Sequence, residues 1–240
     1  MSSKKEDYID IVEKSATIVL AGGQGTRLFP LTATRCKPSV SFGGRYRLID
    51  IPISNSLNAG IAQIFVISQY FASELHQHIL ATYHLDQFRL NGGIELVSPQ
   101  DTAYGKTWFR GTADAVRQNL DFILKNANEY FLILSGDQLY NMDLIEMIEL
   151  IQKENADLVI ASIPVEEAEA RRMGVLKVDR TGRVTDFFEK PQEEKILNTF
   201  RLPENNSHWL GSMGIYVFRR KALQAIMKEE GDDFGRHLIP

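Results

Sequence analysis

An apolar run that breaks into a glycine-rich turn constrains the fold of this chain more than any other feature of the sequence. Residues 16–21 read ATIVLA, and glycines follow at Gly22, Gly23 and Gly25. A short apolar run bounded by glycines is typical of a buried strand. Glycines at the end of such a strand let backbone N–H groups close around phosphate oxygens without interference from a Cβ atom. The segment therefore predicts an anion site where a strand ends.

The turn fits neither common phosphate-binding pattern. Leu28 stands where a dinucleotide fingerprint needs glycine, and no Gly-Lys-Ser/Thr sequence closes a Walker loop. Two cations are present instead, Arg27 within the turn and Lys37 ten residues later. A strand that only turned through glycines would not need Arg27, Pro30 and Lys37-Pro38 together. We therefore interpret the segment as a cradle for a nucleoside triphosphate.

Strand-like runs and helix-compatible segments alternate along the first part of the chain. The strand-like runs are 16–21, 62–68 and 130–135, and the helix-compatible segments are 48–59, 71–82, 112–126 and 142–153. This alternation predicts an α/β fold with a mainly parallel sheet and helices on both faces. Ligands of such sheets lie at the carboxyl ends of the strands, so the glycine turn and Ser135-Gly136-Asp137 are expected to share one edge.

The later part of the chain has a different pattern. Closely spaced β-like runs cover 157–164, 174–178, 183–189 and 210–218. Asp179-Arg180-Thr181-Gly182 is typical of a hairpin turn. We expect these runs to form a mixed, partly antiparallel extension of the sheet. Residues 191–208, with two prolines and Asn205-Asn206, predict a polar loop.

Charge and cysteine content exclude several classes of protein. The 240 residues carry a net charge of −4, which argues against broad nucleic-acid binding and favours small phosphates as ligands. A single cysteine, Cys36, excludes an intrachain disulfide framework, and no apolar segment approaches the ~20 residues that cross a bilayer. We expect a cytoplasmic protein with no membrane partner. Residues 1–15 predict a solvated tail or a short helix before one catalytic domain over 16–240.

A carboxylate follows the apolar strand-like run at 130–135. Asp137 stands where a hard cation that bridges phosphates would need an oxygen ligand. We expect Asp137 to bind Mg²⁺. The other interpretation is a turn residue or a helix cap, which carboxylates at such positions often provide.

The glycine turn closely resembles the GGxGTRLxPLTxxxxKP signature of sugar-1-phosphate nucleotidyltransferases, which join a nucleoside triphosphate to a sugar phosphate and release pyrophosphate. The LSGDxLY context of Asp137 matches the metal-binding motif of the same family. The resemblance implies a Rossmann-like fold whose antiparallel extension covers the sugar. It also implies nucleotide binding by Gly22, Gly23, Gly25 and Thr26, catalytic roles for Arg27, Lys37 and Asp137, and Mg²⁺ as cofactor.

The resemblance also assigns residues to the sugar phosphate. The Glu-Lys-Pro of the family corresponds to Glu189-Lys190-Pro191, with Glu189 toward the sugar hydroxyls and Lys190 toward the phosphate. Gly174 and Ser212 match contacts to glucose phosphate in the resembled enzymes. Taken alone, the charged pair would be read as a solvated surface pair.

Three segments resemble the glucose-1-phosphate adenylyltransferases, the ADP-glucose pyrophosphorylases of glycogen synthesis. They are YRLIDIPISNSLNAGI (46–61), SQYFASELHQHI (68–79) and WFRGTADAVRQNL (108–120). The resemblance implies ATP and glucose 1-phosphate as substrates. Gln100 takes the place of the glutamine that reads adenine, and Gly111 joins the nucleotide site. Phe109 replaces a common tyrosine whose hydroxyl lies near the substrate, so that polar contact is lost.

The positions linked to allosteric regulation depart from the family. Enterobacterial members carry lysine at Thr34, histidine at Ser41 and arginine at Lys125, and only Arg47 is retained. Two interpretations of Arg45 and Arg47 remain open: an anionic effector site, or a solvated face or oligomer contact. The resembled full-length enzymes are homotetramers.

Other reactive side chains are given structural roles. The spacing of His76, His78 and His84 does not gather their imidazoles on one helical face, so we expect surface or interface residues. Cys36 has no histidine base nearby in the sequence, which favours a packed thiol.

The resemblance implies direct in-line attack by a glucose 1-phosphate oxygen on the α-phosphorus of ATP. That oxygen is already ionised near neutral pH, so catalysis is positioning and charge neutralisation without a covalent intermediate. Two alternatives remain: a related transferase that uses UTP or dTTP, and a non-catalytic subunit that binds nucleotide or sugar phosphate. The family's second metal-binding aspartate and its C-terminal β-helix domain have no counterpart before Pro240, so we expect an incomplete catalytic domain.

Overall fold

The computed structural model describes residues 2–23, 25–83, 92–99, 101–102, 105–106, 108–203 and 205–240, without the side chains of residues 2–7, 27, 101–102, 105–106 and 206. In this part of the chain, helices fall short of the length and apolarity needed to cross a membrane.

Four parallel strands form one half of a nine-stranded sheet. They are β1 (Ser15–Ala21), β4 (Gln63–Ser68), β5 (Gly93–Val97) and β8 (Tyr130–Ser135), in the spatial order β8-β1-β4-β5. The register places Ile18 of β1 beside Phe65 of β4 and Ile133 of β8. β1, β4 and β8 are buried along almost their whole length, as expected of parallel strands covered on both faces. These three strands confirm the prediction, whereas β5 was not predicted.

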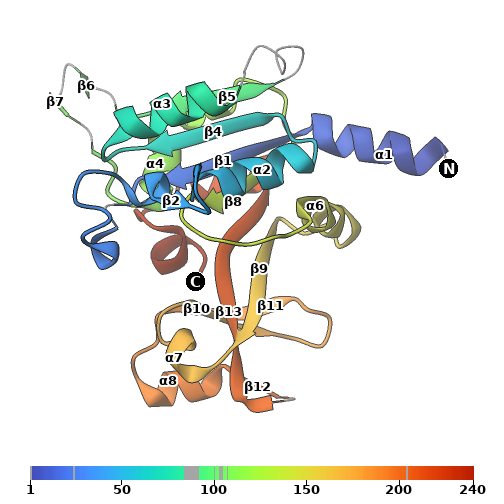
Figure 1. Cartoon of the computed structure of the whole chain (residues 1–240). Helices are drawn as coiled ribbons and strands as arrows, with labels where there is room; N and C mark the ends of the chain where they lie inside the picture. Colours follow the sequence, from blue (N-terminus) through green and yellow to red (C-terminus); the bar gives the residue numbers. More distant parts are fainter. Residues whose placement is uncertain are drawn as a thin grey trace.

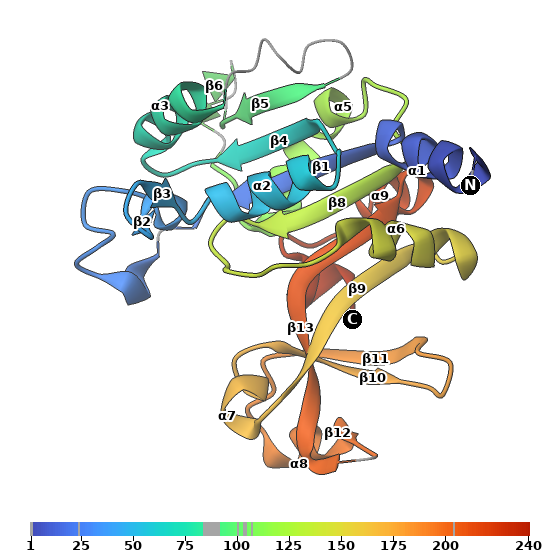
Figure 2. The ribbon, with the colours of Figure 1, turned by 45° about the vertical axis from the view of Figure 1, so that its right-hand side comes forward.

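Helices cover both faces of the parallel half (Figures 1 and 2). One face packs α1 (Ser2–Glu13), α2 (Asp50–Asn58), α3 (Ala72–Thr82) and α6 (Leu144–Lys153) against strand residues such as Val19 and Leu134. The other face packs α4 (Thr112–Gln118), α5 (Leu120–Ile123) and α9 (Arg220–Ile226) against Ile18 and Ile133. Because neighbouring strand residues point to opposite faces, both layers form on one sheet. The predicted α/β architecture is confirmed.

Antiparallel strands continue the sheet into a second lobe (Figure 2). These are β9 (Leu158–Val165), β10 (Gly174–Val178), β11 (Val184–Glu189), β12 (Arg201–Leu202) and β13 (Asn205–Arg219). The first part of the long β13 pairs with β12 and β10, and its last residues pair with β8 of the first lobe. β9 pairs with both parts, and β13 thus joins the two lobes. Asp179 Oδ1 accepts from the N–H groups of Thr181 and Arg183, which confirms the hairpin turn between β10 and β11.

The predicted polar loop at 191–208 is wrong. It contains α8 (Glu194–Thr199), β12 and the start of β13, and the short α7 (Glu167–Ala170) lies in the same lobe. Leu197 and Phe200 are buried with Trp209, whose indole N–H donates to the Leu197 carbonyl at 2.8 Å. The prolines and asparagines dominated the sequence pattern, but Leu197 and Phe200 join a small core with buried side chains from outside the segment: Val165, Ala170, Val175 and Trp209.

Shorter elements complete the part of the chain that the structure describes. They are the 3-10 turns η1 (Thr26–Leu28) and η2 (Lys37–Ser39), the two-residue strands β2 (Ser41–Phe42), β3 (Tyr46–Arg47), β6 (Asp101–Thr102) and β7 (Gly105–Lys106), and the π-helical turn η4 (Phe234–Leu238). The helix predicted over 112–126 is interrupted at Asn119, between α4 and α5.

Candidate functional site

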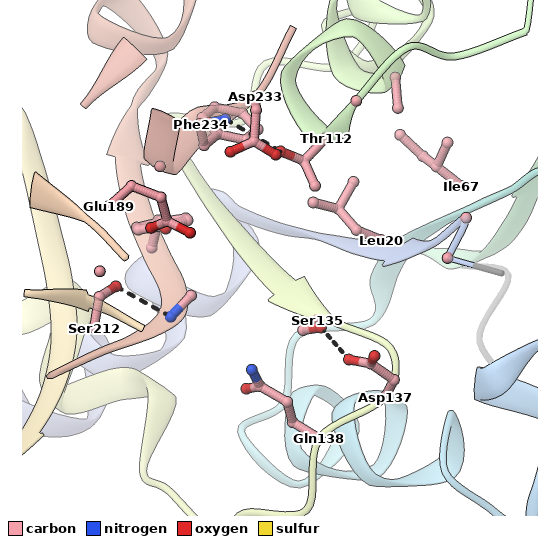
Figure 3. A pocket seen from close by; sticks show the side chains of 18 of the residues that line it. Leu20, Ile67, Thr112, Ser135, Asp137, Gln138, Glu189, Ser212, Asp233 and Phe234 are labelled. Atoms are coloured by element: carbon pink, nitrogen blue, oxygen red, sulfur yellow. Dashed lines mark hydrogen bonds between the residues drawn. The ribbon is translucent and has the colours of Figure 1, made fainter. Parts of the chain in front are cut away.

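A cavity of about 570 Å³ lies at the carboxyl ends of the parallel strands, where the second lobe meets the first. Gly22 and Gly23 follow β1, and Gln69 and Tyr70 follow β4. Ser135 ends β8, and Asp137 lies in the turn after it. The glycine turn and Ser135-Gly136-Asp137 therefore share one edge of the sheet, as predicted. Figure 3 shows Asp137, Glu189 and Asp233 around the same space.

The Asp137 carboxylate is held by two neighbours. Its Oδ1 accepts from the Ser135 hydroxyl at 2.5 Å, and its Oδ2 lies 2.7 Å from the ammonium of Lys37. Gly25 makes room for that lysine, since a Cβ at Gly25 would lie 2.7 Å from the Lys37 Cβ, and its φ of 68° also favours glycine. Gly25 is thus outside the cavity lining but sets the position of Lys37.

The opposite wall brings together the residues predicted for the sugar phosphate. Glu189 and Lys190 come from the end of β11, Gly174 from the start of β10 and Ser212 from β13. Lys190 has a φ of 52°, which non-glycine residues adopt at a cost, and its N–H donates to the Met173 carbonyl at 3.0 Å. The hydrogen bond to Met173 thus supports the left-handed backbone of Lys190 at the point where this residue lines the cavity.

Two glycines surround the Glu189 carboxylate. A Cβ at Gly174 would lie 2.9 Å from Glu189 Oε2, and a Cβ at Gly235 would lie 2.8 Å from it. The other oxygen, Oε1, pairs with the Lys190 ammonium at 2.9 Å. The Glu189 side chain is 17% exposed and lines the cavity, so a ligand in the cavity can reach its carboxylate.

Several cavity residues were not predicted from the sequence. They are Arg110, Thr112, Gln138, Arg172, Tyr216, Asp233 and Phe234. Burial raises the pKa of Tyr216 to about 12; the Ser212 hydroxyl opposes this rise, and the carboxylates of Glu189 and Asp233 add to it. Asp233 was given no role from the sequence, because only the folded chain brings its turn back to the cavity.

Phe109 and Gly111 line the cavity from the segment before α4. The Phe109 N–H donates to Gln69 Oε1 at 2.5 Å, and Gln69 Nε2 donates to the Phe109 carbonyl at 3.4 Å. Gly111 packs so closely on Asp232 that a Cβ would overlap the Asp232 carbonyl oxygen. This close packing alone explains why residue 111 is a glycine. Its role in the nucleotide site stays a prediction.

Five predicted nucleotide or catalytic residues are not placed in the cavity. Gly25 and Lys37 are not among the lining residues, although the Lys37 ammonium contacts Asp137, which is one of them. Thr26 is exposed within η1 and does not line it. The side chain of Arg27 and the whole of Gln100 lie outside the described residues. Their assigned roles stay predictions.

The family of the chain follows from a match along nearly its whole length. The family model for nucleotidyl transferases matches residues 16–240. The chain belongs to this family. Membership in the nucleotidyl transferases supports transfer of a nucleotidyl group to a sugar 1-phosphate as the general reaction.

The nucleotidyl transferase provides a carboxylate suited to a hard cation. Mg²⁺ in enzymes that act on nucleotides is commonly held by one or two carboxylates together with substrate phosphates. The Asp137 side chain is 28% exposed, lines the cavity and already has a cationic neighbour in Lys37. Because the described residues contain no group of three or more possible metal ligands, Mg²⁺ would need substrate phosphates as further ligands beside Asp137, and its binding stays a prediction.

The histidines predicted at the surface are partly buried in this nucleotidyl transferase. His76 Nε2 is 2.8 Å from the Ser68 hydroxyl, and burial lowers the pKa of His76. His78 Nε2 lies 2.8 Å from Oδ1 of the buried Asp50. Both imidazoles join α3 to neighbouring elements and are partly buried, so they are not freely exposed; their role at an interface stays a prediction, and His84 lies outside the described residues. Cys36 is buried beside Ser39, as a packed thiol should be.

The arginines considered for an effector differ in their surroundings. Arg47 Nη1 pairs with Glu74 Oε1 at 3.1 Å, and Arg45 lies over the Tyr46 ring at 5.5 Å. Lys125 lies over the Phe122 ring at 4.8 Å. Arg47 would have to exchange its carboxylate partner to bind an anion. These contacts leave both interpretations of the region open.

Proposed function

We propose that this nucleotidyl transferase transfers AMP from ATP to glucose 1-phosphate and forms ADP-glucose and pyrophosphate. One observation carries the proposal: the glycine turn with Asp137 and the Glu189-Lys190 pair line the same cavity from opposite lobes. The first set suits nucleotide phosphates and the second suits a sugar phosphate. Choice of ATP and glucose rests on the resemblance of residues 46–61, 68–79 and 108–120 to glucose-1-phosphate adenylyltransferases.

Glucose 1-phosphate binds at the wall formed by the second lobe in this proposal. The Lys190 ammonium exchanges part of its contact with Glu189 for the sugar phosphate. Glu189 and Asp233 accept hydrogen bonds from sugar hydroxyls, since ionised carboxylates are acceptors only. The Tyr216 phenol is neutral at physiological pH because its pKa is about 12, so it can donate a hydrogen bond at this wall.

ATP binds at the edge of the parallel strands in this proposal. Gly22 and Gly23 allow the backbone to approach the phosphates, and Lys37 leaves Asp137 to contact them. Arg27 steadies the departing pyrophosphate. When bound, Mg²⁺ neutralises phosphate charge beside Asp137.

The chemical step needs no protein base. An ionised phosphate oxygen of glucose 1-phosphate attacks the α-phosphorus of ATP, and the bond from that phosphorus to the bridging oxygen breaks as pyrophosphate leaves. No proton has to move, so the side chains act by alignment and by stabilising charge. The product is the activated glucosyl donor for α-glucan synthesis in the resembled enzymes.

Product analysis tests this function. Pyrophosphate release is measured with glucose 1-phosphate and ATP, UTP or dTTP in turn, with Mg²⁺ present, and the sugar nucleotide is identified by mass spectrometry. ADP-glucose formed in preference to the other products supports the proposal. Preference for UTP or dTTP, or binding of both substrates without turnover, refutes it in favour of one of the two alternatives.

A further inference from the structure

The first turn of α4 and the turn at 231–239 are joined backbone to backbone beside the cavity. The Asp232 carbonyl accepts from the N–H groups of Ala113 at 2.9 Å and Asp114 at 3.1 Å. Gly111 leaves no space for a side chain against the same carbonyl. Two backbone N–H groups in the first turn of α4 therefore bond to the Asp232 carbonyl, and these bonds tie the turn at 231–239 to the helix.

Thr112 is the side chain at the centre of this contact (Figure 3). Its hydroxyl donates to Asp233 Oδ2 at 3.0 Å and accepts from the Phe234 N–H at 3.1 Å. The donor and acceptor of each hydrogen bond are determined. The Phe234 N–H can only donate, and the Thr112 hydroxyl gives its single proton to the carboxylate. The Thr112 hydroxyl thus bonds to the side chain of Asp233 and to the backbone of Phe234.

The Asp233 carboxylate is fixed through both oxygens. Oδ1 accepts from the Arg236 N–H at 3.1 Å, while Oδ2 accepts from Thr112. Each carboxylate oxygen keeps a further lone pair, and the side chain lines the cavity on the wall that carries Glu189. The two hydrogen bonds therefore set the direction in which Asp233 presents its remaining acceptors.

The backbone of the turn has an anchor that does not involve Thr112. Phe234 is 1% exposed and packs on Tyr216 and Phe218, with ring centroids 5.9 and 5.8 Å apart. Removal of the Thr112 hydroxyl should therefore free the Asp233 side chain more than it moves the turn. A positioning role can be separated from a structural one on this basis.

We infer that Thr112 is a positioning residue for the sugar phosphate, which acts by orienting the Asp233 carboxylate. The inference rests on the proposed function, in which Asp233 accepts from sugar hydroxyls. Hydrogen bonds to charged groups are strong enough that loss of one should weaken sugar-phosphate binding by about 10-fold. ATP binding should change little, because the variant keeps the Asp232 contacts that hold the neighbouring Gly111, and Asp137 lies at the other wall.

Steady-state kinetics of Thr112→Val and Thr112→Ser test the inference. Valine keeps the branched shape without the hydroxyl, and serine keeps the hydroxyl. We expect Thr112→Val to raise the KM for glucose 1-phosphate about 10-fold with the KM for ATP within about twofold of wild type. Thr112→Ser should restore the wild-type KM. Equal rises in both KM values, no rise in the valine variant, or failure of serine to rescue would overturn the inference.

Two additions make the result decisive. Combination with Asp233→Asn should give a penalty smaller than the sum of the single effects, because Thr112 acts through Asp233; additive penalties would contradict that route. Thr112→Ala replaces the valine variant if thermal unfolding shows that valine prevents folding.

Direct binding separates this inference from the proposed function. If the wild type forms no ADP-glucose, the proposed function fails, and calorimetry of glucose 1-phosphate binding tests Thr112. Binding about 10-fold weaker in Thr112→Val alone would support the positioning role. Equal binding by all variants, or no binding by the wild type, would overturn it.

Discussion

Asp137 lies between the Ser135 hydroxyl and the Lys37 ammonium, so its carboxylate is held in position before a nucleotide binds. Asp137→Asn keeps the size of the side chain but removes its charge. Loss of one preorganised electrostatic group typically lowers turnover by ~10²-fold or more, and we expect that loss here at saturating substrates. Asp121→Asn is the control, because Asp121 is exposed on α5, away from the cavity lining. A wild-type rate for Asp137→Asn would refute the role of this carboxylate.

Gly235 lies against the Glu189 carboxylate, where a Cβ would be 2.8 Å from Oε2. Gly235→Ala should push that flexible carboxylate aside and raise the KM for glucose 1-phosphate about 10-fold or more, since small misplacements of a binding group are costly. The measurement is the KM for each substrate. Gly93→Ala is a matched control, because no atom lies within 4 Å of a Cβ there. An unchanged KM in Gly235→Ala would contradict the placement of Glu189 at the sugar.

Tyr216 should make stability depend on pH in the alkaline range. Its pKa rises from 10.0 to about 12 on folding because of burial, so the folded state keeps the proton where the unfolded state has lost it. This stabilisation is complete below pH 10 and is lost as the pH rises toward 12. Relative to Tyr216→Phe, the free energy of unfolding of the wild type should fall by on the order of 2 kcal/mol between pH 10 and pH 12. The measurement is the free energy of urea unfolding of both proteins as a function of pH. If it changes equally with pH in the wild type and in Tyr216→Phe, the raised pKa is contradicted.

At the level of elements, the periodic patterns predicted the main strands and helices because burial on two faces leaves a clear apolar signal. β1, β4 and β8 coincide with the predicted runs within a residue or so. The short α8 and β12 were missed, since their apolar residues are few and belong to a core completed by Trp209 from another segment. β5 was missed because its five residues, GIELV, place a charged side chain within the apolar run.

The two tryptophans test this small core. Trp209 is 1% exposed and donates to the Leu197 carbonyl, whereas Trp108 is 52% exposed and stacks on Tyr70. Trp209→Phe should lower the free energy of unfolding by about 2 kcal/mol, from the lost hydrogen bond and lost packing volume. Trp108→Phe should change it little. Urea unfolding of both variants gives the comparison. Equal free energies of unfolding for Trp209→Phe and Trp108→Phe would show that the core around Trp209 does not stabilise the fold.

At the level of the whole molecule, the site is a product of two lobes. Motifs predicted Gly22, Gly23, Asp137, Glu189 and Lys190, and the fold brings all of them to one cavity. Asp233, Tyr216 and Thr112 could not be predicted in the same way. They enter the cavity because β13 crosses between the lobes and because the turn at 231–239 packs on α4. The contacts of Thr112 with Asp233 and Phe234 join segments more than 100 positions apart, which no local pattern reports.

The most direct measurement is the identity of the sugar nucleotide formed when ATP, UTP and dTTP compete for the protein with glucose 1-phosphate and Mg²⁺. We predict that ADP-glucose dominates, with one pyrophosphate released for each ADP-glucose formed. Formation of UDP-glucose or dTDP-glucose as the main product, or no sugar nucleotide despite binding of both substrates, would contradict the proposed function.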